Sequence, residues 1–149
     1  MPRGAPVSLL ELIDVMDDVS SWTRFHYLDR ETGAVETGLT EEVDSEGNFA
    51  DVRADPGRFV VIEALPIWLR LQVREAFAQQ GGHDPALRLD LMESLQTSRP
   101  LLEFQKQLRR HPGLLDEFLA YRLEALGAAA SEWLAVHKVR SADRVGPSN

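Results

Sequence analysis

The sequence predicts an α+β fold, in which a small antiparallel sheet of about three strands near the amino terminus packs against a mostly helical carboxyl-terminal bundle. Three observations predict it. Residues 22–29 carry aromatic or β-branched side chains at alternate positions and run into turn residues, which favours a β-hairpin. Residues 58–65 contain the short apolar run Phe-Val-Val-Ile. From residue 67 onward, apolar residues recur at helical spacing, with proline or glycine between the segments.

The composition indicates one globular domain, which we place at residues 8–137. The chain has 149 residues, of which 44% are hydrophobic and 27% charged. Residues 1–7 and 138–149 lack apolar periodicity, so a disordered leader and a disordered tail are expected. No apolar run is long enough to cross a bilayer and no signal-peptide pattern is present, which predicts a cytoplasmic location away from membranes. The absence of cysteine excludes disulfides, thiol nucleophiles and cysteine-based zinc sites.

The first helix is expected to begin after Ser8, a residue that can cap it. Glu11, three positions later, completes a capping box. The helix then runs from residue 9 to about residue 19. Its apolar face consists of Leu9, Leu12, Ile13 and Met16.

The strands are expected at residues 22–29, 34–37 and 58–65. The first two form the hairpin around turn residues 29–33. The third is apolar on both faces, which is typical of a central strand. Residues 40–55 are acidic and predict a short helix near residues 41–43, followed by a loop.

Four helices are expected after Pro66. The first covers residues 67–80, with Leu69, Val73, Ala76 and Phe77 on its apolar face, and ends at two glycines. The second begins at Pro85 and aligns leucines at positions 87, 91 and 95. The third is capped by Ser98 and ends near residue 110, and the fourth covers residues 114–137.

The net charge of −8 is concentrated in the first part of the chain. Residues 1–60 carry 5 basic and 13 acidic residues, whereas residues 61–149 carry 11 of each. An acidic half repels phosphate backbones, so nucleic-acid binding is not expected, and a basic protein partner suits this half better. A solvated acidic surface that only aids solubility is the simpler alternative.

Two acidic patterns offer oxygen ligands for a metal ion. Glu11, Asp14 and Asp18 share one helix face and could hold a hard cation, but they could equally be the solvated face of an amphipathic helix. The oxygen-rich segment 44–55 lacks the glycine and the glutamate that a calcium loop needs at its sixth and twelfth positions. A metal site is therefore not expected, and no cofactor is predicted.

The sequence contains no nucleophile elbow, Walker loop or dinucleotide-binding motif, so no catalytic residue is assigned. His26 lies on the first predicted strand and could pair with a carboxylate such as Asp29, three positions later. Arg24 lies between aromatic residues on the same strand, where it could face a partner or a ligand. A base-stacking surface is less favoured than core packing for this strand, because its surroundings are acidic.

Arg122 is the most informative single residue, because it lies within the apolar stripe of the final helix. At about 100° per residue, it projects in nearly the same direction as Leu115 and Trp133. Phe118, Leu119, Leu126, Ala129 and Val136 flank that line. A guanidinium there needs a carboxylate, carbonyl groups or an external anion. The favoured interpretation is an internal ion pair, above all with a carboxylate from the first sixty residues, or a set of carbonyl hydrogen bonds that joins the helix to the sheet. An anion-binding arginine beside Tyr121, or a side chain left in water, are the alternatives.

Several short segments together resemble a bacterial group known as uncharacterised protein family 0158 of the UPF series. The segments are Leu9-Leu-Glu-Leu-Ile-Asp, Tyr27-Leu-Asp-Arg-Glu-Thr-Gly, Arg58-Phe-Val-Val-Ile, Phe104-x-x-x-Leu108 with Pro112, Phe118-x-x-Tyr-Arg and Glu132-Trp-Leu. The resemblance covers roughly residues 9–137. The stretch before the phenylalanine usually reads Gly-Ala-Phe-Arg-Arg-Phe in this family, whereas Leu102 and Glu103 replace its arginines here. The family has no assigned activity, so the resemblance implies none.

The expected function is that of a non-catalytic interaction or regulatory module, which uses its acidic half or a helical groove to hold a protein partner. The alternative is a hydrolase or a binding protein for a small anionic molecule, with Arg122 as the anchor. The wide leucine and tryptophan face of the final helix also leaves room for a homodimer.

Overall fold

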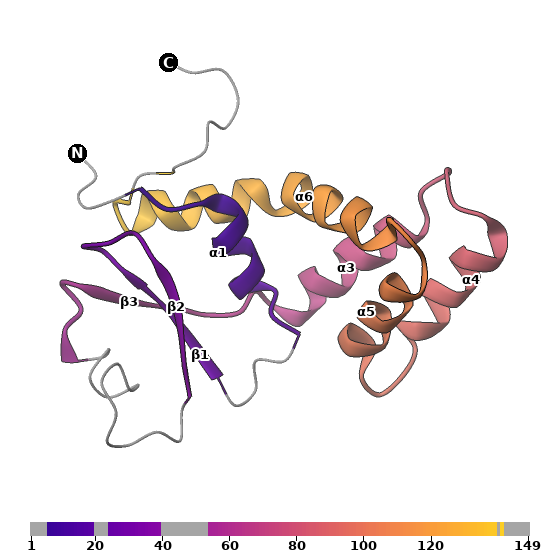
Figure 1. Ribbon diagram of the computed structural model, residues 1–149, viewed down its shortest axis with the longest axis horizontal. Coiled ribbons are helices and arrows are strands. Elements are labelled where there is room, and N and C mark those ends of the chain that lie inside the picture. The colour runs from indigo at the N-terminus through magenta and orange to yellow at the C-terminus, as the bar shows by residue number, and fades with distance from the viewer. Residues whose placement is uncertain (1–5, 20–23, 40–53, 140, 142–149) are drawn as a thin grey trace, which may run out of the picture. The chain divides into compact units, whose positions relative to one another are not determined.

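The computed structural model describes residues 6–19, 24–39, 54–139 and 141, and it confirms the α+β fold (Figure 1). The chain forms two compact units. We call residues 1–64 and 126–149 the sheet unit, and residues 65–125 the helical unit. That both belong to one domain over residues 8–137 stays a prediction. The short helix expected near residues 41–43 lies outside the described residues.

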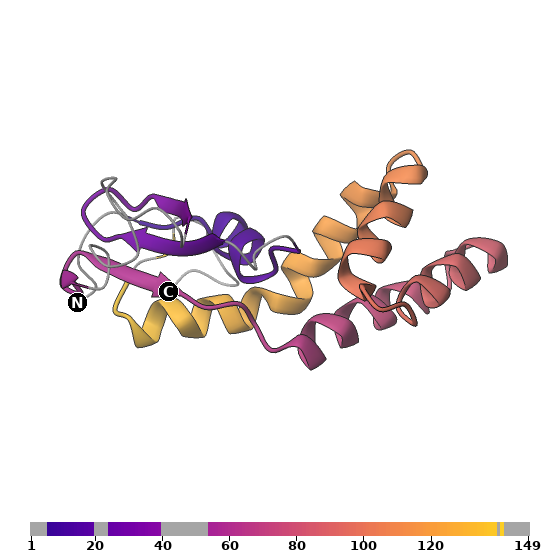
Figure 2. The same ribbon diagram turned by 90° about the horizontal axis from the view of Figure 1, so that it is seen from below.

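The sheet has three antiparallel strands in the order β2-β1-β3 (Figure 2). Strand β1 (Arg24–Asp29) is central, with β2 (Val35–Leu39) on one side and β3 (Phe59–Ile62) on the other. The predicted hairpin is confirmed. Gly33 closes its turn at φ 74°, a conformation that favours glycine, and donates its N–H to the carbonyl of Asp29 at 2.8 Å.

Among the strands that the structure describes, β3 lies at an edge of the sheet, so the prediction of a central strand was wrong (Figure 2). Its apolar sequence has another cause. On one face, Ile62 is buried at 3% exposure; on the other, Phe59 and Val61 pack against Phe25 and Tyr27 of β1. We call these last four residues the aromatic cluster. A strand can thus be apolar on both faces while one of its edges carries no neighbouring strand among the described residues.

Helix α1 (Leu9–Met16) confirms the predicted cap and the predicted apolar face. The N–H of Glu11 lies 3.4 Å from the hydroxyl of Ser8, and all four expected apolar residues are buried. The helix ends before residue 19: Asp17 is its C-cap, with φ −119° and ψ 27°, and its N–H makes the last helical bond, to the carbonyl of Ile13 at 3.0 Å. Just before the helix, Val7 is buried and forms a parallel bridge with Ser141.

The helical unit contains α3 (Ile67–Ala78), α4 (Pro85–Ser94), α5 (Pro100–Arg110) and the first half of α6 (Leu114–Val136) (Figure 2). The four predicted helices are therefore confirmed. The cap of α5 differs from the prediction. Arg99, not Ser98, is its N-cap residue, and Pro100 follows in the first turn.

Aromatic rings from three helices form the centre of the helical unit. Phe118 of α6 lies edge-on to Phe77 of α3 and to Phe104 of α5, with ring centroids 5.2 and 5.4 Å apart. All three rings are almost completely buried. Such edge-to-face pairs add to the stability that burial already provides.

The buried stripe of α6 winds around the helix. Its buried residues follow one another at every fourth position: Leu114, Phe118, Arg122, Leu126, Ala130 and Leu134. Each step of four residues turns the stripe by about 40°, so its two ends differ by about 200°. Trp133 is consequently only half-buried and Val136 is 68% exposed, although a straight stripe placed both in the apolar face. Among the described helices, none is both long and apolar enough to cross a membrane.

Candidate functional site

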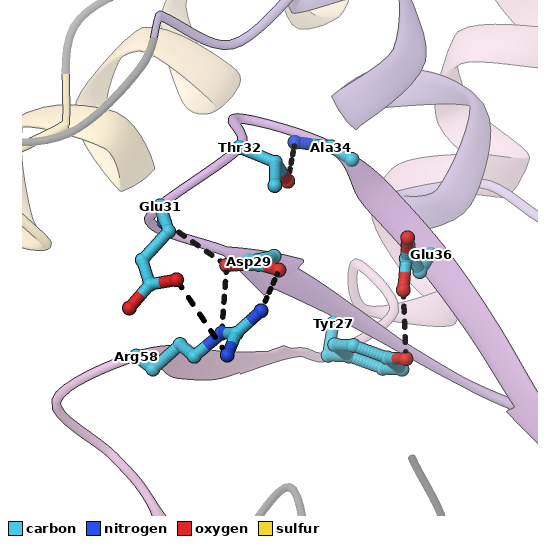
Figure 3. A network of polar contacts seen from close by, with 7 residues as sticks. All are labelled: Tyr27, Asp29, Glu31, Thr32, Ala34, Glu36 and Arg58. Carbon is cyan, nitrogen blue, oxygen red and sulfur yellow. Dashed lines mark hydrogen bonds and ion pairs between the residues drawn. The ribbon is translucent and has the colours of Figure 1, made fainter. Parts of the chain in front are cut away.

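Asp29, at the end of β1, is the centre of a polar network (Figure 3). Its carboxylate accepts two hydrogen bonds from Arg58, at 3.2 and 3.1 Å, and one from the backbone N–H of Glu31 at 3.0 Å. Glu31 lies 3.5 Å from another nitrogen of the same guanidinium. The network fixes the hairpin turn to the residue that precedes β3.

Burial alone would raise the pKa of Asp29. The hydrogen bonds from Arg58 and Glu31, together with the positive charge of Arg58, outweigh burial and lower the pKa below its usual 3.8. Asp29 also raises the pKa of Arg58. The Asp29 carboxylate is therefore ionised at neutral pH and hydrogen-bonded to Arg58 and to the Glu31 N–H. This is the state of a structural ion pair and not of a general acid.

Tyr27 and Glu36 form a cross-strand pair on the face of the aromatic cluster (Figure 3). The Tyr27 hydroxyl donates to the Glu36 carboxylate at 2.9 Å. Its ring stacks on Phe25 at 5.6 Å and lies edge-on to Phe59 at 5.5 Å. Burial, followed by the hydrogen bond and charge of Glu36, raises the pKa of Tyr27 to about 12. Tyr27 therefore remains a hydrogen-bond donor at neutral pH.

His26 pairs with a carboxylate, but the partner is Asp18 and not Asp29. Nε2 lies 2.9 Å from Asp18 and Nδ1 lies 2.7 Å from the hydroxyl of Thr37, which is opposite on β2. In the neutral ring, Nε2 carries the proton toward the carboxylate and Nδ1 accepts from the hydroxyl. Asp29 faces the other side of the strand, three positions away.

The Asp18–His26–Thr37 contacts join the end of α1 to two strands. The order carboxylate, imidazole, hydroxyl also occurs in hydrolases, where the hydroxyl attacks the substrate. Here His26 is 6% exposed and lies directly opposite Thr37 in the ladder, so the contacts satisfy a buried imidazole. We interpret the set as a structural link.

The remaining candidates in the sheet unit do not form a metal site in the described part of the chain. No group of three acidic or histidine side chains that could hold an ion occurs there. Asp18, one of the three acidic residues that share a face, is instead bound to His26. The side chain of Arg24 lies outside the described parts, as does most of segment 44–55.

Arg122 is buried in the helical unit with 5% exposure, so the alternative that left it in water was wrong. It takes part in at least one polar or ring interaction. Tyr121 beside it is half-buried, with its ring 5.5 Å from that of Phe77. Two further arginines of the same unit, Arg70 and Arg74, are buried at 6% and 1% exposure.

Sequence reasoning did not identify Arg70 and Arg74. The guanidinium of Arg74 lies over the rings of Phe118 and Phe104, at 5.2 and 5.9 Å, and Nη1 donates to the Arg70 carbonyl at 3.1 Å. The signal was present, because both arginines share a helical face with Val73 and Phe77. The sequence pattern placed Leu69 and Ala76 on that face, but Leu69 is half-buried and Ala76 is exposed.

Comparison with known proteins confirms the resemblance. A family model described as "Uncharacterised protein family (UPF0158)" matches residues 6–145. A relative from Pseudomonas aeruginosa, named UPF0158 protein PA5073, is 28% identical over 124 residues, which cover 83% of this chain and 80% of the relative. No solved structure matches the chain closely enough to count as similar. These names specify no substrate, partner or activity.

Proposed function

Since this chain belongs to the uncharacterised protein family UPF0158, whose description names no activity, we propose from its structure that it is a non-catalytic module that binds another protein. The observation that carries the proposal is the exposed apolar start of α3. Ile67 is 53% and Trp68 65% exposed, side by side on a regular helix. We call these two residues the α3 tip.

Exposing a large apolar side chain to water costs free energy, and a partner that covers the side chain recovers it. A tryptophan can bury 150–250 Å², and tryptophan is enriched among the residues that dominate binding energy at protein interfaces. Trp68 cannot turn inward, because it lies about 160° around the helix from the buried Arg70. A partner with an apolar pocket suits this surface.

The charge distribution supports a basic partner. The sheet unit carries 8 basic and 16 acidic residues, and the helical unit carries 8 of each, so the net charge of −8 belongs to the sheet unit. Such a field raises the association rate of a positively charged protein and repels nucleic acid.

The contacts that polar side chains of the sheet make within the fold support a non-catalytic role. Asp29, Tyr27 and His26 each have a side-chain partner that holds two strands, or a helix and a strand, together. These three side chains therefore serve contacts within the fold.

Site-specific crosslinking in cells of the source organism tests the proposal. A photoreactive phenylalanine analogue replaces Trp68 in one variant and Leu89, which is 58% exposed on α4, in the control. We expect one discrete adduct from position 68 and none from position 89. Equal labelling at both positions, or no adduct at position 68, would contradict the proposal.

A second candidate function, binding of a small anion, is favoured by the three buried arginines of the helical unit. Arginine is well suited to phosphate and carboxylate ligands, because its planar guanidinium binds them through two parallel hydrogen bonds. Thermal unfolding in phosphate, sulfate, nucleotides and divalent ions tests this function. An increase in Tm that Arg122→Met abolishes supports it, and an unchanged Tm with every ligand contradicts it.

A further inference from the structure

The exposed charges of the helical unit are segregated by sign. The unit has eight basic residues, of which three are buried and Arg88 is half-buried. The other four are exposed, and all lie on α5 or at its N-cap position: Arg99, Lys106, Arg109 and Arg110. We call these four residues the α5 basic face. The exposed acidic residues of the unit all lie elsewhere: Glu75, Asp84, Asp90, Glu93, Asp116, Glu117 and Glu124.

The α5 basic face is a short stripe on a helix whose opposite side is buried. At about 100° per residue, Arg99, Lys106 and Arg110 project within about 40° of one another, and Arg109 lies about 60–100° to one side. Phe104, on the other side of the helix, is fully buried and lies edge-on to Phe118. Arg99 and Arg110 are 11 positions apart in the sequence. This separation is a rise of about 16 Å along a helix.

Contacts within the fold leave three of these charges unused. Lys106 lies 3.2 Å from Glu103, and this pair has no net charge. The side chains of Arg99, Arg109 and Arg110 form no hydrogen bond or ion pair with the residues that the structure describes. Three uncompensated positive charges on one helix therefore face solvent.

Helix stability accounts for the two arginines at the end of α5 but not for the one at its start. Arg109 and Arg110 are in the last turn, where a positive charge interacts favourably with the helix dipole. Arg99 is the N-cap residue, and its side chain makes no capping hydrogen bond. That position favours serine, threonine, aspartate or asparagine, and the dipole there is unfavourable to a cation. An anionic group bound next to Arg99 removes this conflict.

We propose that the α5 basic face binds a short acidic segment of another protein. The guanidinium of arginine binds a carboxylate through two parallel hydrogen bonds, so three free arginines suit aspartate and glutamate side chains. A helix of about twelve residues with carboxylates along one side matches the length of the stripe. The proposal goes beyond the α3 tip, because it concerns another helix and a partner segment that is acidic.

The limited length of the stripe favours a protein segment over a nucleic acid or a membrane. Duplex DNA carries one negative charge per about 1.7 Å of its axis and continues beyond the stripe in both directions. Outside the α5 basic face, every exposed charged residue of the helical unit is acidic and repels such a polyanion. An anionic membrane is an extended surface in the same way. A protein segment can end where the α5 basic face ends, so its carboxylates contact arginines only.

Selection from a library of random peptides of about twelve residues tests the proposal. Peptides are selected on the wild-type protein, and their affinities are then measured for Trp68→Ala and for the triple variant Arg99→Gln, Arg109→Gln, Arg110→Gln. We expect a group of peptides that bind the triple variant about tenfold more weakly and Trp68→Ala unchanged. This group should contain about twice as much aspartate and glutamate as the library. Peptides that lose affinity only for Trp68→Ala belong to the α3 tip.

A control variant makes the same change in net charge away from α5. Gln72→Glu, Gln79→Glu and Ala86→Glu together add three negative charges at exposed positions of α3, its C-cap and α4. The acidic peptides should bind this variant within about threefold of the wild-type affinity, because salt screens charges that lie beyond direct contact. Circular dichroism and Tm should be the same for the wild type and both triple variants, since all six positions are exposed.

Two outcomes would overturn the proposal. In the first, no selected peptide loses more affinity for the triple arginine variant than for the control variant, or the peptides that do are not enriched in acidic residues. In the second, the wild-type protein binds DNA of about 20 base pairs, or vesicles of phosphatidylserine, more tightly than the selected peptides at the same ionic strength.

Discussion

Arg58 donates two hydrogen bonds to Asp29, from Nε to Oδ1 at 3.2 Å and from Nη2 to Oδ2 at 3.1 Å. The two residues are 29 positions apart, at the end of β1 and directly before β3. A bidentate pair fixes distance and orientation together, which a lysine could not do. The pair therefore fixes the position of the start of β3 relative to the central strand. Each member of the network can be replaced separately by mutation.

Asp29→Ala should destabilise the protein by about 2 kcal/mol, because it leaves the N–H of Glu31 and the guanidinium of Arg58 without their acceptor. Asp29→Asn keeps one oxygen for the Glu31 N–H and should cost roughly half as much. Urea unfolding followed by circular dichroism measures both. Equal losses for the two variants would show that the backbone bond contributes nothing.

The same pair predicts a loss of stability in acid. The pKa of Asp29 is lowered in the folded protein, so its contribution is fully present above the unfolded value of 3.8 and is lost as pH falls below it. Between about pH 5 and pH 3, the wild-type chain should lose more unfolding free energy than Asp29→Asn. Parallel curves for the two proteins would contradict this assignment.

Tyr27 should lose its phenolic proton only at high pH. Its pKa of about 12 means that the folded protein holds the phenolic proton more tightly than the unfolded chain, so stability is lost as pH rises from 10.0 toward 12. In a Tyr121→Phe background, ultraviolet absorbance follows Tyr27 alone. Glu36→Gln should lower the transition by removing a negative charge, whereas Glu31→Gln, which does not contact the hydroxyl, should leave it in place.

His26→Ala should cost about 1–3 kcal/mol, since it removes the partners of Asp18 and Thr37 together. Thr37→Val removes only the hydroxyl and should cost about 1 kcal/mol. His111→Ala, in the loop between α5 and α6, serves as the control and should stay within about 0.5 kcal/mol. If neither Thr37→Val nor His26→Ala changes the free energy of unfolding, the link between α1 and the strands does not stabilise the fold.

Arg122→Ala should destabilise the protein by about 3 kcal/mol, and Arg122→Met by clearly less, because methionine fills most of the volume and carries no charge. Both changes at the exposed Arg110 should stay within about 0.5 kcal/mol. Chemical denaturation of the four variants gives the comparison. Small and equal effects at position 122 would mean that the burial of this guanidinium contributes little.

The sequence was sufficient for the secondary structure because its signals there are local. The Ser8 and Glu11 cap, the turn that ends in Gly33, and Pro66 ahead of α3 each depend on residues within a few positions of one another. These patterns predicted the hairpin, the first helix and the four later helices correctly. Ser98 was a weaker case, since Arg99 stands between it and Pro100.

The site depends on contacts between distant residues, and there the sequence was insufficient. His26 had a nearby carboxylate in Asp29, yet the alternation of the strand places that residue on the opposite face, and Asp18 binds instead. The apolar sequence of β3 matched a central strand and could not show that, among the described strands, β3 has a neighbour on one side only. The winding stripe of α6 was missed because a straight face was assumed over more than six turns.

The sheet unit is built from both ends of the sequence, and this orders the events of folding. Arg30 donates to the carbonyl of His137 at 2.7 Å, across 107 positions, and Val7 bridges Ser141. Loops of this length close slowly. During synthesis, residues 65–125 emerge as one continuous segment and can form the helical unit, whereas the sheet unit is complete only after residues 126–149 have followed. We therefore expect the contacts of Arg30 with His137 and of Val7 with Ser141 to form last.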